Sequence, residues 1–87
     1  MIMSMFSLPV SYAGEDIIKL FSKSKDLKIK QVSYVGFELI AGTIFKLNGE
    51  EIAVPSSGSF FTPISNDFKI SSLEFPNVYP TNVYILY

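Results

Sequence analysis

The sequence predicts an all-β protein, a small antiparallel β-sandwich or partly open barrel of about six to eight short strands. Short apolar runs, many of them alternating with polar residues, recur with turn signals about every ten residues. The 87 residues are 48% hydrophobic, which suits a single core and leaves no room for a second domain, so residues 1–87 are expected to form one domain. We expect at most one short helix, near residues 14–22.

The first strand is expected within residues 1–8. Apolar side chains fall on both parities of this run, a pattern typical of a strand that is covered on both faces or lies in an interface. Pro9 then ends the strand or places it at an edge. Residues 1–14 carry no charged side chain and lack the basic start of a signal peptide, so we expect an intact, soluble chain without a membrane span.

The segment 11–22 is compatible with a short helix or another strand. Glu15 and Asp16 would favour a helix N-terminus, and Lys19 and Lys23 would favour its end. Two or three turns of helix are not stable alone, so the local sequence leaves both alternatives open.

Residues 27–39 indicate one long strand or two strands joined by a bulge at Gly36. The clearest element follows, because Asn48-Gly49 is a preferred two-residue hairpin turn between two alternating runs. A type I′ turn there fixes the cross-strand register and places Lys46 opposite Glu51. The other expected pairs are Leu47 with Glu50, Phe45 with Ile52, Ile44 with Ala53 and Thr43 with Val54.

The C-terminal half predicts three further strand regions. Residues 55–58 are expected to form a loop before a short strand at 59–62, and residues 65–67 a turn. A strand from Phe68 should be interrupted by a bulge at Ser71-Ser72. The final run, 82–87, is strand-forming to its end and is expected to lie inside a sheet.

Several enzyme mechanisms are excluded by composition. The chain has no His and no Cys, which removes Ser-His-Asp and Cys-His arrangements and the usual zinc sites. Among the carboxylates, Glu50 and Glu51 are neighbours on one strand and point to opposite faces. We expect Asp67 to belong to a turn and Glu74 to be a solvated charge. The sequence therefore predicts no enzyme, with no catalytic, cofactor-binding or metal-binding residue.

Nucleic acid is not an expected partner. The net charge is −1, and all seven basic residues are Lys. Five of these lie between Lys19 and Lys30, where nearby acidic residues balance them and a solvated strand face is the simpler interpretation.

Aromatic and methionine side chains instead indicate contacts between proteins. Eight Phe and five Tyr exceed what so small a core needs, so we expect self-association or binding to another protein. The interface candidates are Met3, Met5, Phe6, Tyr79, Tyr84 and Tyr87. Tyr79, Tyr84 and Tyr87 would also suit a platform for a sugar ligand, a less favoured alternative.

The string GTIFKLNGEEIAVPSSGSFFTP at residues 42–63, with the terminal NVYILY, resembles small β-sandwich virion proteins of tailed bacteriophages, of the head-decoration, head-fibre or collar type. The resemblance is one of style and covers residues 42–87. It implies a structural protein without an active site, assembled in the host cytoplasm into a virion through contacts with its own copies or another virion protein. The alternative is a monomeric, cytoplasmic carbohydrate- or protein-binding β-domain.

Overall fold

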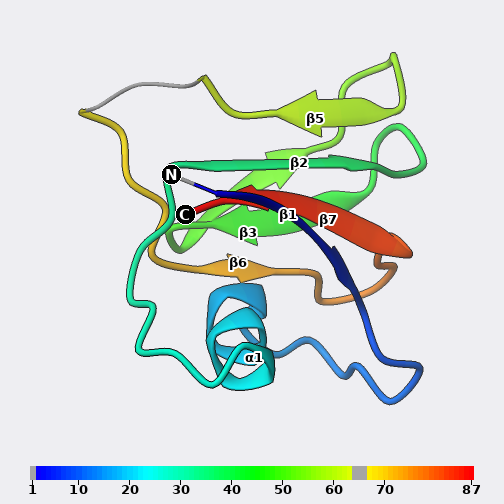
Figure 1. Ribbon diagram of the computed structural model, residues 1–87. Coiled ribbons are helices and arrows are strands. Elements are labelled where there is room, and N and C mark those ends of the chain that lie inside the picture. Colours follow the sequence, from blue (N-terminus) through cyan, green and yellow to red (C-terminus); the bar gives the residue numbers. More distant parts are fainter. Residues whose placement is uncertain (1, 64–66) are drawn as a thin grey trace.

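The structure is a computed structural model that describes residues 2–63 and 67–87 (Figure 1). Within those ranges it contains seven strands and one helix. In chain order these are β1 (Met3–Ser7), α1 (Ile17–Ser24), β2 (Tyr34–Glu38), β3 (Ile44–Leu47), β4 (Glu50–Ala53), β5 (Ser59–Phe61), β6 (Leu73–Glu74) and β7 (Asn82–Leu86). The turn expected at residues 65–67 lies mostly outside the described residues.

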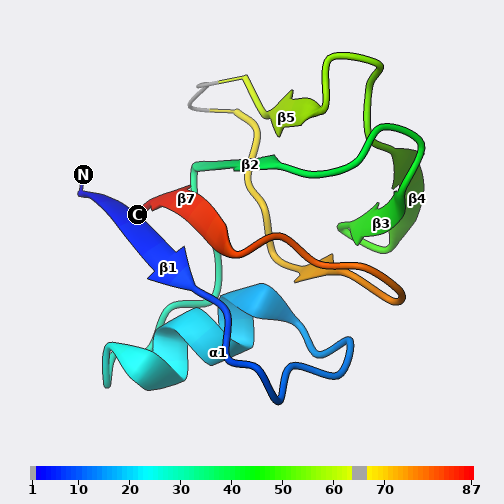
Figure 2. The same cartoon turned by 90° about the vertical axis from the view of Figure 1, so that its right-hand side faces the viewer.

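The strands form two antiparallel sheets, which confirms the all-β prediction. One sheet has the order β1-β7-β2-β5 and the other β4-β3-β6. The two sheets do not close into a barrel, and Figure 2 shows β3 and β4 set apart from β1 and β7. The terminal strand β7 lies between β1 and β2, as expected for a strand-forming sequence that continues to the end of the chain.

The Asn48-Gly49 hairpin forms in the predicted register. Both turn residues have positive φ, 51° at Asn48 and 83° at Gly49, as a type I′ turn requires. Lys46 pairs with Glu51, and the other predicted pairs within the two strands also form. The Val54 N–H donates to the Thr43 carbonyl over 2.9 Å, which extends the same register by one pair.

Residues 11–22, for which the sequence allowed either a helix or a strand, contain most of the helix α1. Asp16 caps it, because its Oδ1 accepts a hydrogen bond from the Ile18 N–H over 3.0 Å. Ile17, Ile18 and Phe21 are buried on one side of the helix. The burial of this apolar side stabilises a helix too short to persist alone.

The prediction of strand over residues 27–39 is wrong for residues 27–33. The Leu27 N–H donates to the Ser22 carbonyl and the Ile29 N–H donates to Ser22 Oγ. Because both N–H groups bond to Ser22 at the end of α1, they are not available to a neighbouring strand. Regular strand begins only at Tyr34. The alternative of two strands joined by a bulge at Gly36 is also wrong, since β2 pairs without interruption on both sides there.

The strand expected from Phe68 is reduced to one bridge and a short strand. Ile70 pairs with Val32 in an isolated bridge, and β6 covers only Leu73–Glu74. Between them, Asn48 Oδ1 accepts the Ser71 N–H over 2.8 Å. The hairpin turn therefore occupies the place where the sequence predicted a bulge.

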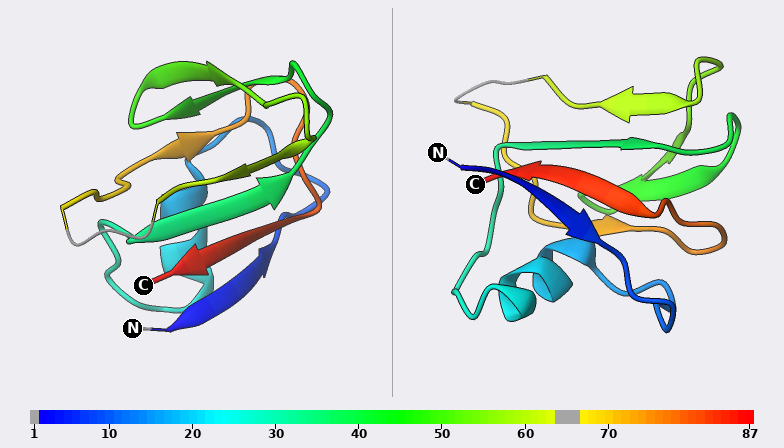
Figure 3. Two further views of the ribbon diagram at one scale, coloured as in Figure 1. Left: turned by 90° about the horizontal axis from the view of Figure 1, so that it is seen from above. Right: turned by 45° about the vertical axis from the view of Figure 1, so that its right-hand side comes forward.

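The core lies beneath the inner face of the four-stranded sheet. Phe37 contacts Phe45 and Phe75 edge to face, with ring centroids 5.1 and 4.9 Å apart, and this joins the two sheets. Under β1 and β7, the helix residue Phe21 packs against Phe6 and Tyr87 at 5.7 and 5.0 Å. Seen from above, the four-stranded sheet lies in front of α1, which covers only its inner side (Figure 3, left).

Candidate interaction surface on the four-stranded sheet

A row of apolar residues crosses the face of the four-stranded sheet that points away from α1. Met5 on β1 pairs with Tyr84 on β7, Tyr84 pairs with Gly36 on β2, and Gly36 pairs with Phe61 on β5. Side chains that pair directly across antiparallel strands share one face. The side chains of Met5, Tyr84 and Phe61 are 56%, 44% and 54% exposed, so one line across four strands presents large apolar groups to solvent.

A second row lies beside the first. Met3 pairs with Leu86, and Leu86 with Tyr34, which places all three on the same side as Met5. Met3 is exposed, and the other two are partly buried. We define the outer face by these two rows, which together contain Met3, Met5, Tyr34, Phe61, Tyr84 and Leu86.

At the centre of the outer face β2 carries a glycine, which leaves room for neighbouring side chains above its backbone. A Cβ built on Gly36 would lie 2.5 Å from Phe61 Cδ1 and 2.6 Å from the Tyr34 hydroxyl oxygen. The two aromatic side chains therefore extend over the bare backbone of Gly36, which is buried beneath them. Partial burial of its hydroxyl raises the pKa of Tyr34.

A polar margin borders the outer face at one end of the strands. Glu38, Thr81, Asn82 and Tyr84 line an open depression of about 250 Å³. The Ser7 hydroxyl donates to Asn82 Oδ1 over 2.8 Å, which fixes the amide and leaves its nitrogen able to donate to a ligand. The exposed Tyr84 ring, the carboxylate and the amide thus converge on one hollow.

The structure brings three of the six predicted interface residues together. Met3, Met5 and Tyr84 lie side by side on the outer face. Phe6 and Tyr87 point to the opposite side of the same strands and pack against Phe21 within the chain.

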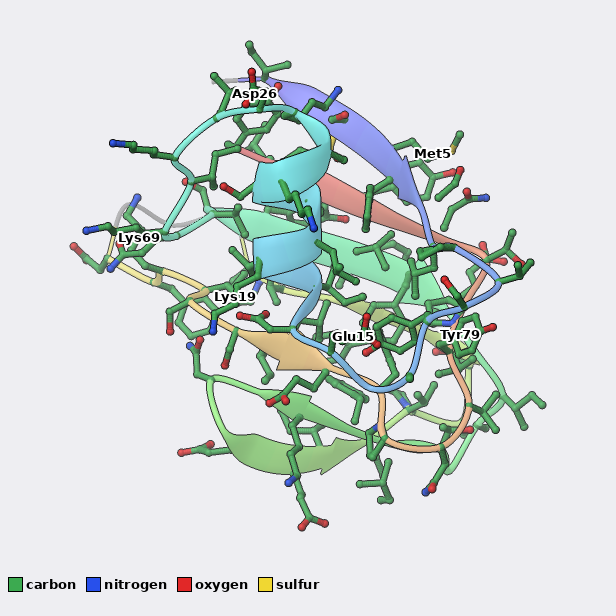
Figure 4. All side chains as sticks on the ribbon, turned by 90° about the horizontal axis from the view of Figure 1, so that it is seen from below. Met5, Glu15, Lys19, Asp26, Lys69 and Tyr79 are labelled. Atoms are coloured by element: carbon green, nitrogen blue, oxygen red, sulfur yellow. The ribbon has the colours of Figure 1, made fainter. Side chains whose placement is uncertain are left out.

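Tyr79, the sixth interface candidate, lies apart from Met5 (Figure 4). Its ring packs against that of Tyr12 at a centroid distance of 5.0 Å, and its hydroxyl donates to the Val10 carbonyl. It is therefore held within a local aromatic cluster and does not contribute to the outer face.

Sequence reasoning missed Phe61, Tyr34 and Leu86. For Phe61 a signal was present, because Phe60 and Phe61 are adjacent in a predicted strand and must point to opposite faces. Phe60 packs into the core against Phe45, which leaves Phe61 outside. Only the pairing of β2 with β7 places Tyr34 and Leu86 on the same face as Met3.

The charged residues gather elsewhere. Lys19 and Lys23 are exposed on α1, whereas Lys28 and Lys30 lie on the irregular segment after the helix, not on a strand face as expected. Glu38 is the charged side chain at the margin of the outer face. Four lysines thus lie on α1 or the segment after it, and Glu38 lies at the margin of the outer face.

Among residues 2–63 and 67–87, no group of three or more acidic side chains is placed to hold a metal ion. The same ranges contain no helix with the length and hydropathy needed to cross a membrane.

Neither a protein-family model, nor a curated protein, nor a solved structure matches this chain.

Proposed function

We propose that this chain is a non-enzymatic assembly protein whose copies contact one another through the outer face, as a component of a bacteriophage virion. The observation that carries the proposal is the row Met5, Tyr84 and Phe61, which exposes large apolar side chains side by side across the sheet. Clusters of this kind in soluble proteins mark contact surfaces, and Tyr, Phe and Met are enriched in such surfaces.

The distribution of charge supports the same function. Repeated copies of one chain bring identical surfaces together, so a contact surface with many like charges would repel itself. The outer face as defined contains no ionisable group except its two tyrosine hydroxyls, and the lysines lie mainly on α1 and the segment after it. The virion setting rests on the resemblance of residues 42–87 in sequence style.

Sedimentation equilibrium of matched variants tests this proposal. Tyr84→Lys places a charge in the middle of the outer face, and we expect it to weaken association at least tenfold, a change of about 1.4 kcal/mol. Leu27→Lys is the control, because Leu27 is also exposed, at 51%, but lies on the segment after α1. A wild-type chain that remains monomeric at all concentrations, or equal weakening by both variants, would contradict the proposal.

A second candidate, binding of a carbohydrate, is favoured by the depression at the margin of the outer face. An exposed aromatic ring can stack on the apolar side of a sugar ring, while Glu38 and Asn82 accept from and donate to its hydroxyl groups. If this candidate is correct, a glycan array should identify a ligand that raises the Tm. Tyr84→Ala and Glu38→Gln should abolish that increase, and Leu27→Ala should retain it. Absence of any bound glycan would remove this candidate.

A further inference from the structure

We propose that strand β1 pairs antiparallel with β1 of a second copy around a two-fold axis at Met5, joining two four-stranded sheets into one sheet of eight strands. This inference rests on the proposed function, because it assumes that copies associate. It adds a second contact between copies, through one edge of the sheet, and the register of that contact.

The backbone of β1 has one bonded side and one open side. The Ile2 N–H donates to the Tyr87 carbonyl over 2.6 Å, and the Tyr87 N–H donates back over 3.0 Å. The Leu8 N–H donates to the Thr81 carbonyl. Hydrogen bonding alternates along an antiparallel strand, so even-numbered residues bond to β7. The N–H and C=O groups of Met3, Met5 and Ser7 therefore point away from β7.

Strand β1 is an edge strand of the four-stranded sheet, and the view from above shows it at the margin (Figure 3, left). Exposed edges usually carry features that prevent pairing, such as charges, proline or short length. The edge strand β4 carries Glu50 and Glu51, and the two-residue β6 carries Glu74. The edge strand β5 has only three residues, against five in β1. In contrast, β1 has no charge and no proline over its whole length.

The sequence of β1 favours pairing with β1 of a second copy. Pairing about Met5 overlaps the strand on itself over its full length and places Met3 opposite Ser7 of the partner subunit. In this register the open groups of Met3, Met5 and Ser7 all find partners, and no like charges meet. Odd-numbered residues pair with odd-numbered residues, so the two outer faces lie on the same side of the joined sheet.

The size of the outer face also favours this contact. A four-stranded sheet about five residues long covers roughly 320 Å² in plan, given strands about 4.8 Å apart and a rise of about 3.3 Å per residue. A stable interface buries about 800 Å² on each partner. A contact through the outer face of one copy would therefore be small, and joining two copies through β1 doubles the apolar area that can meet a further layer of protein.

An apolar hollow beside β1 is placed to receive a side chain of the added strand. A depression of about 280 Å³ lies between β1 and α1 and is lined mainly by Phe6, Pro9 and Leu20, with Ser7, Lys23 and Ser24 at its border. In the two-fold register, Ile2 of the partner subunit falls opposite Leu8, next to this depression. Ile2 is 58% exposed in the single chain, so the pairing would bury an apolar side chain that is otherwise in solvent.

Single-cysteine variants test the register, because the chain has no cysteine of its own. Hydrogen-bonded antiparallel pairs have Cα atoms about 5.5 Å apart, within the range of a disulfide. Met5→Cys should therefore form a disulfide dimer under mild oxidation, and so should a mixture of Met3→Cys with Ser7→Cys. Met3→Cys alone and Phe61→Cys alone are controls, since residue 3 would lie about 13 Å from its own equivalent.

The outcomes separate this inference from the proposed function. Fast cross-linking of Met5→Cys and of the mixed pair, with at least tenfold slower cross-linking of both controls, would support pairing through β1. Association of the wild-type chain without that preference, or preferential cross-linking of Phe61→Cys, would overturn the pairing and leave the proposed function standing. A monomeric wild-type chain with no cross-linking in any variant would overturn both. Circular dichroism of each variant checks that the fold is retained.

Discussion

The Phe61 ring lies over the backbone of Gly36, where a Cβ would come within 2.5 Å of the ring. This close approach packs a β5 side chain onto β2 on the outer face. A larger residue at position 36 would raise the aromatic side chains away from the sheet. The contact between Gly36 and Phe61 thus links one small residue to the shape of the proposed interaction surface.

Substitution of Gly36 measures this contact. We expect Gly36→Ala to lower the free energy of unfolding by about 1 kcal/mol, because the clash outweighs the gain in strand propensity. In a Phe61→Ala background the same substitution should be neutral or stabilising, since the ring is absent and the Tyr34 hydroxyl can move aside. Urea unfolding of the wild type, the two single variants and the double variant gives the coupling free energy between Gly36 and Phe61. Equal effects in both backgrounds would show that Gly36 and Phe61 do not interact.

The Asn48 side chain should contribute stability beyond its role in the turn. Its Oδ1 accepts the Ser71 N–H over 2.8 Å, and its Nδ2 donates to the Lys69 carbonyl over 3.1 Å. Asn48→Gly keeps the positive φ and removes both bonds, so we expect a loss of about 1–2 kcal/mol. Asn48→Asp keeps the acceptor and should lose less. If Asn48→Gly unfolds at the wild-type urea concentration, the side chain has no such role.

Thr62 should stabilise the end of the β2–β5 pair through its hydroxyl group. It is buried, and its Oγ1 accepts the Val35 N–H over 3.0 Å. Thr62→Val leaves that buried N–H without an acceptor and should cost about 1–3 kcal/mol. Thr62→Ser retains the hydroxyl and loses a methyl group, for about 1 kcal/mol or less. Chemical unfolding compares the two, and a smaller loss for Thr62→Val than for Thr62→Ser would contradict this role.

Stability should decline at alkaline pH in a way that depends on Tyr12. Burial raises the pKa of Tyr12 above its ordinary value of 10.0, and the negative charges of Glu15, Glu74 and Asp16 add to that rise, against the lowering effect of the Phe75 N–H bond. As pH rises, the Tyr12 hydroxyl therefore loses its proton at a lower pH in the unfolded chain than in the folded one. The stability due to neutral Tyr12 is complete below pH 10 and is lost as pH rises through the folded-state pKa.

The variant Tyr12→Phe isolates this effect. At neutral pH it should be less stable than wild type by about 1–3 kcal/mol, because the Phe75 N–H loses its acceptor, the Tyr12 hydroxyl oxygen, at 2.9 Å. Above pH 10 the difference between the two proteins should shrink. Thermal unfolding between pH 7 and pH 11 follows both, and a difference that stays constant with pH would show that Tyr12 does not titrate differently in the two states.

The hairpin at Asn48-Gly49 was predictable because its information is local. Two turn residues fix the register, and the pairing of Lys46 with Glu51 then agrees with it. The choice of helix for α1 was not predictable in this way. It depends on Phe21 meeting Phe6 and Tyr87, which come from opposite ends of the chain. The strand wrongly predicted from residue 27 likewise failed because Ser22 takes the backbone bonds of that segment.

The candidate surface could be predicted only in part. Alternation along β1 separates Met3 and Met5 from Phe6, but it does not reveal which side of the strand a helix will cover. The same limit applies to Tyr84 and Tyr87 on β7. The position of α1 decides the question, and that position depends on contacts between distant segments.

An NMR dilution series of the wild-type chain tests the central claim most directly. As the concentration rises, we expect the amide signals of Met5, Tyr84 and Phe61 to shift or broaden together while light scattering shows a mass above the 9.7 kDa of one chain. Signals from exposed α1 residues such as Lys19 should not change. Unchanged signals across β1, β7 and β5 together with a constant mass of 9.7 kDa would contradict assembly through the outer face.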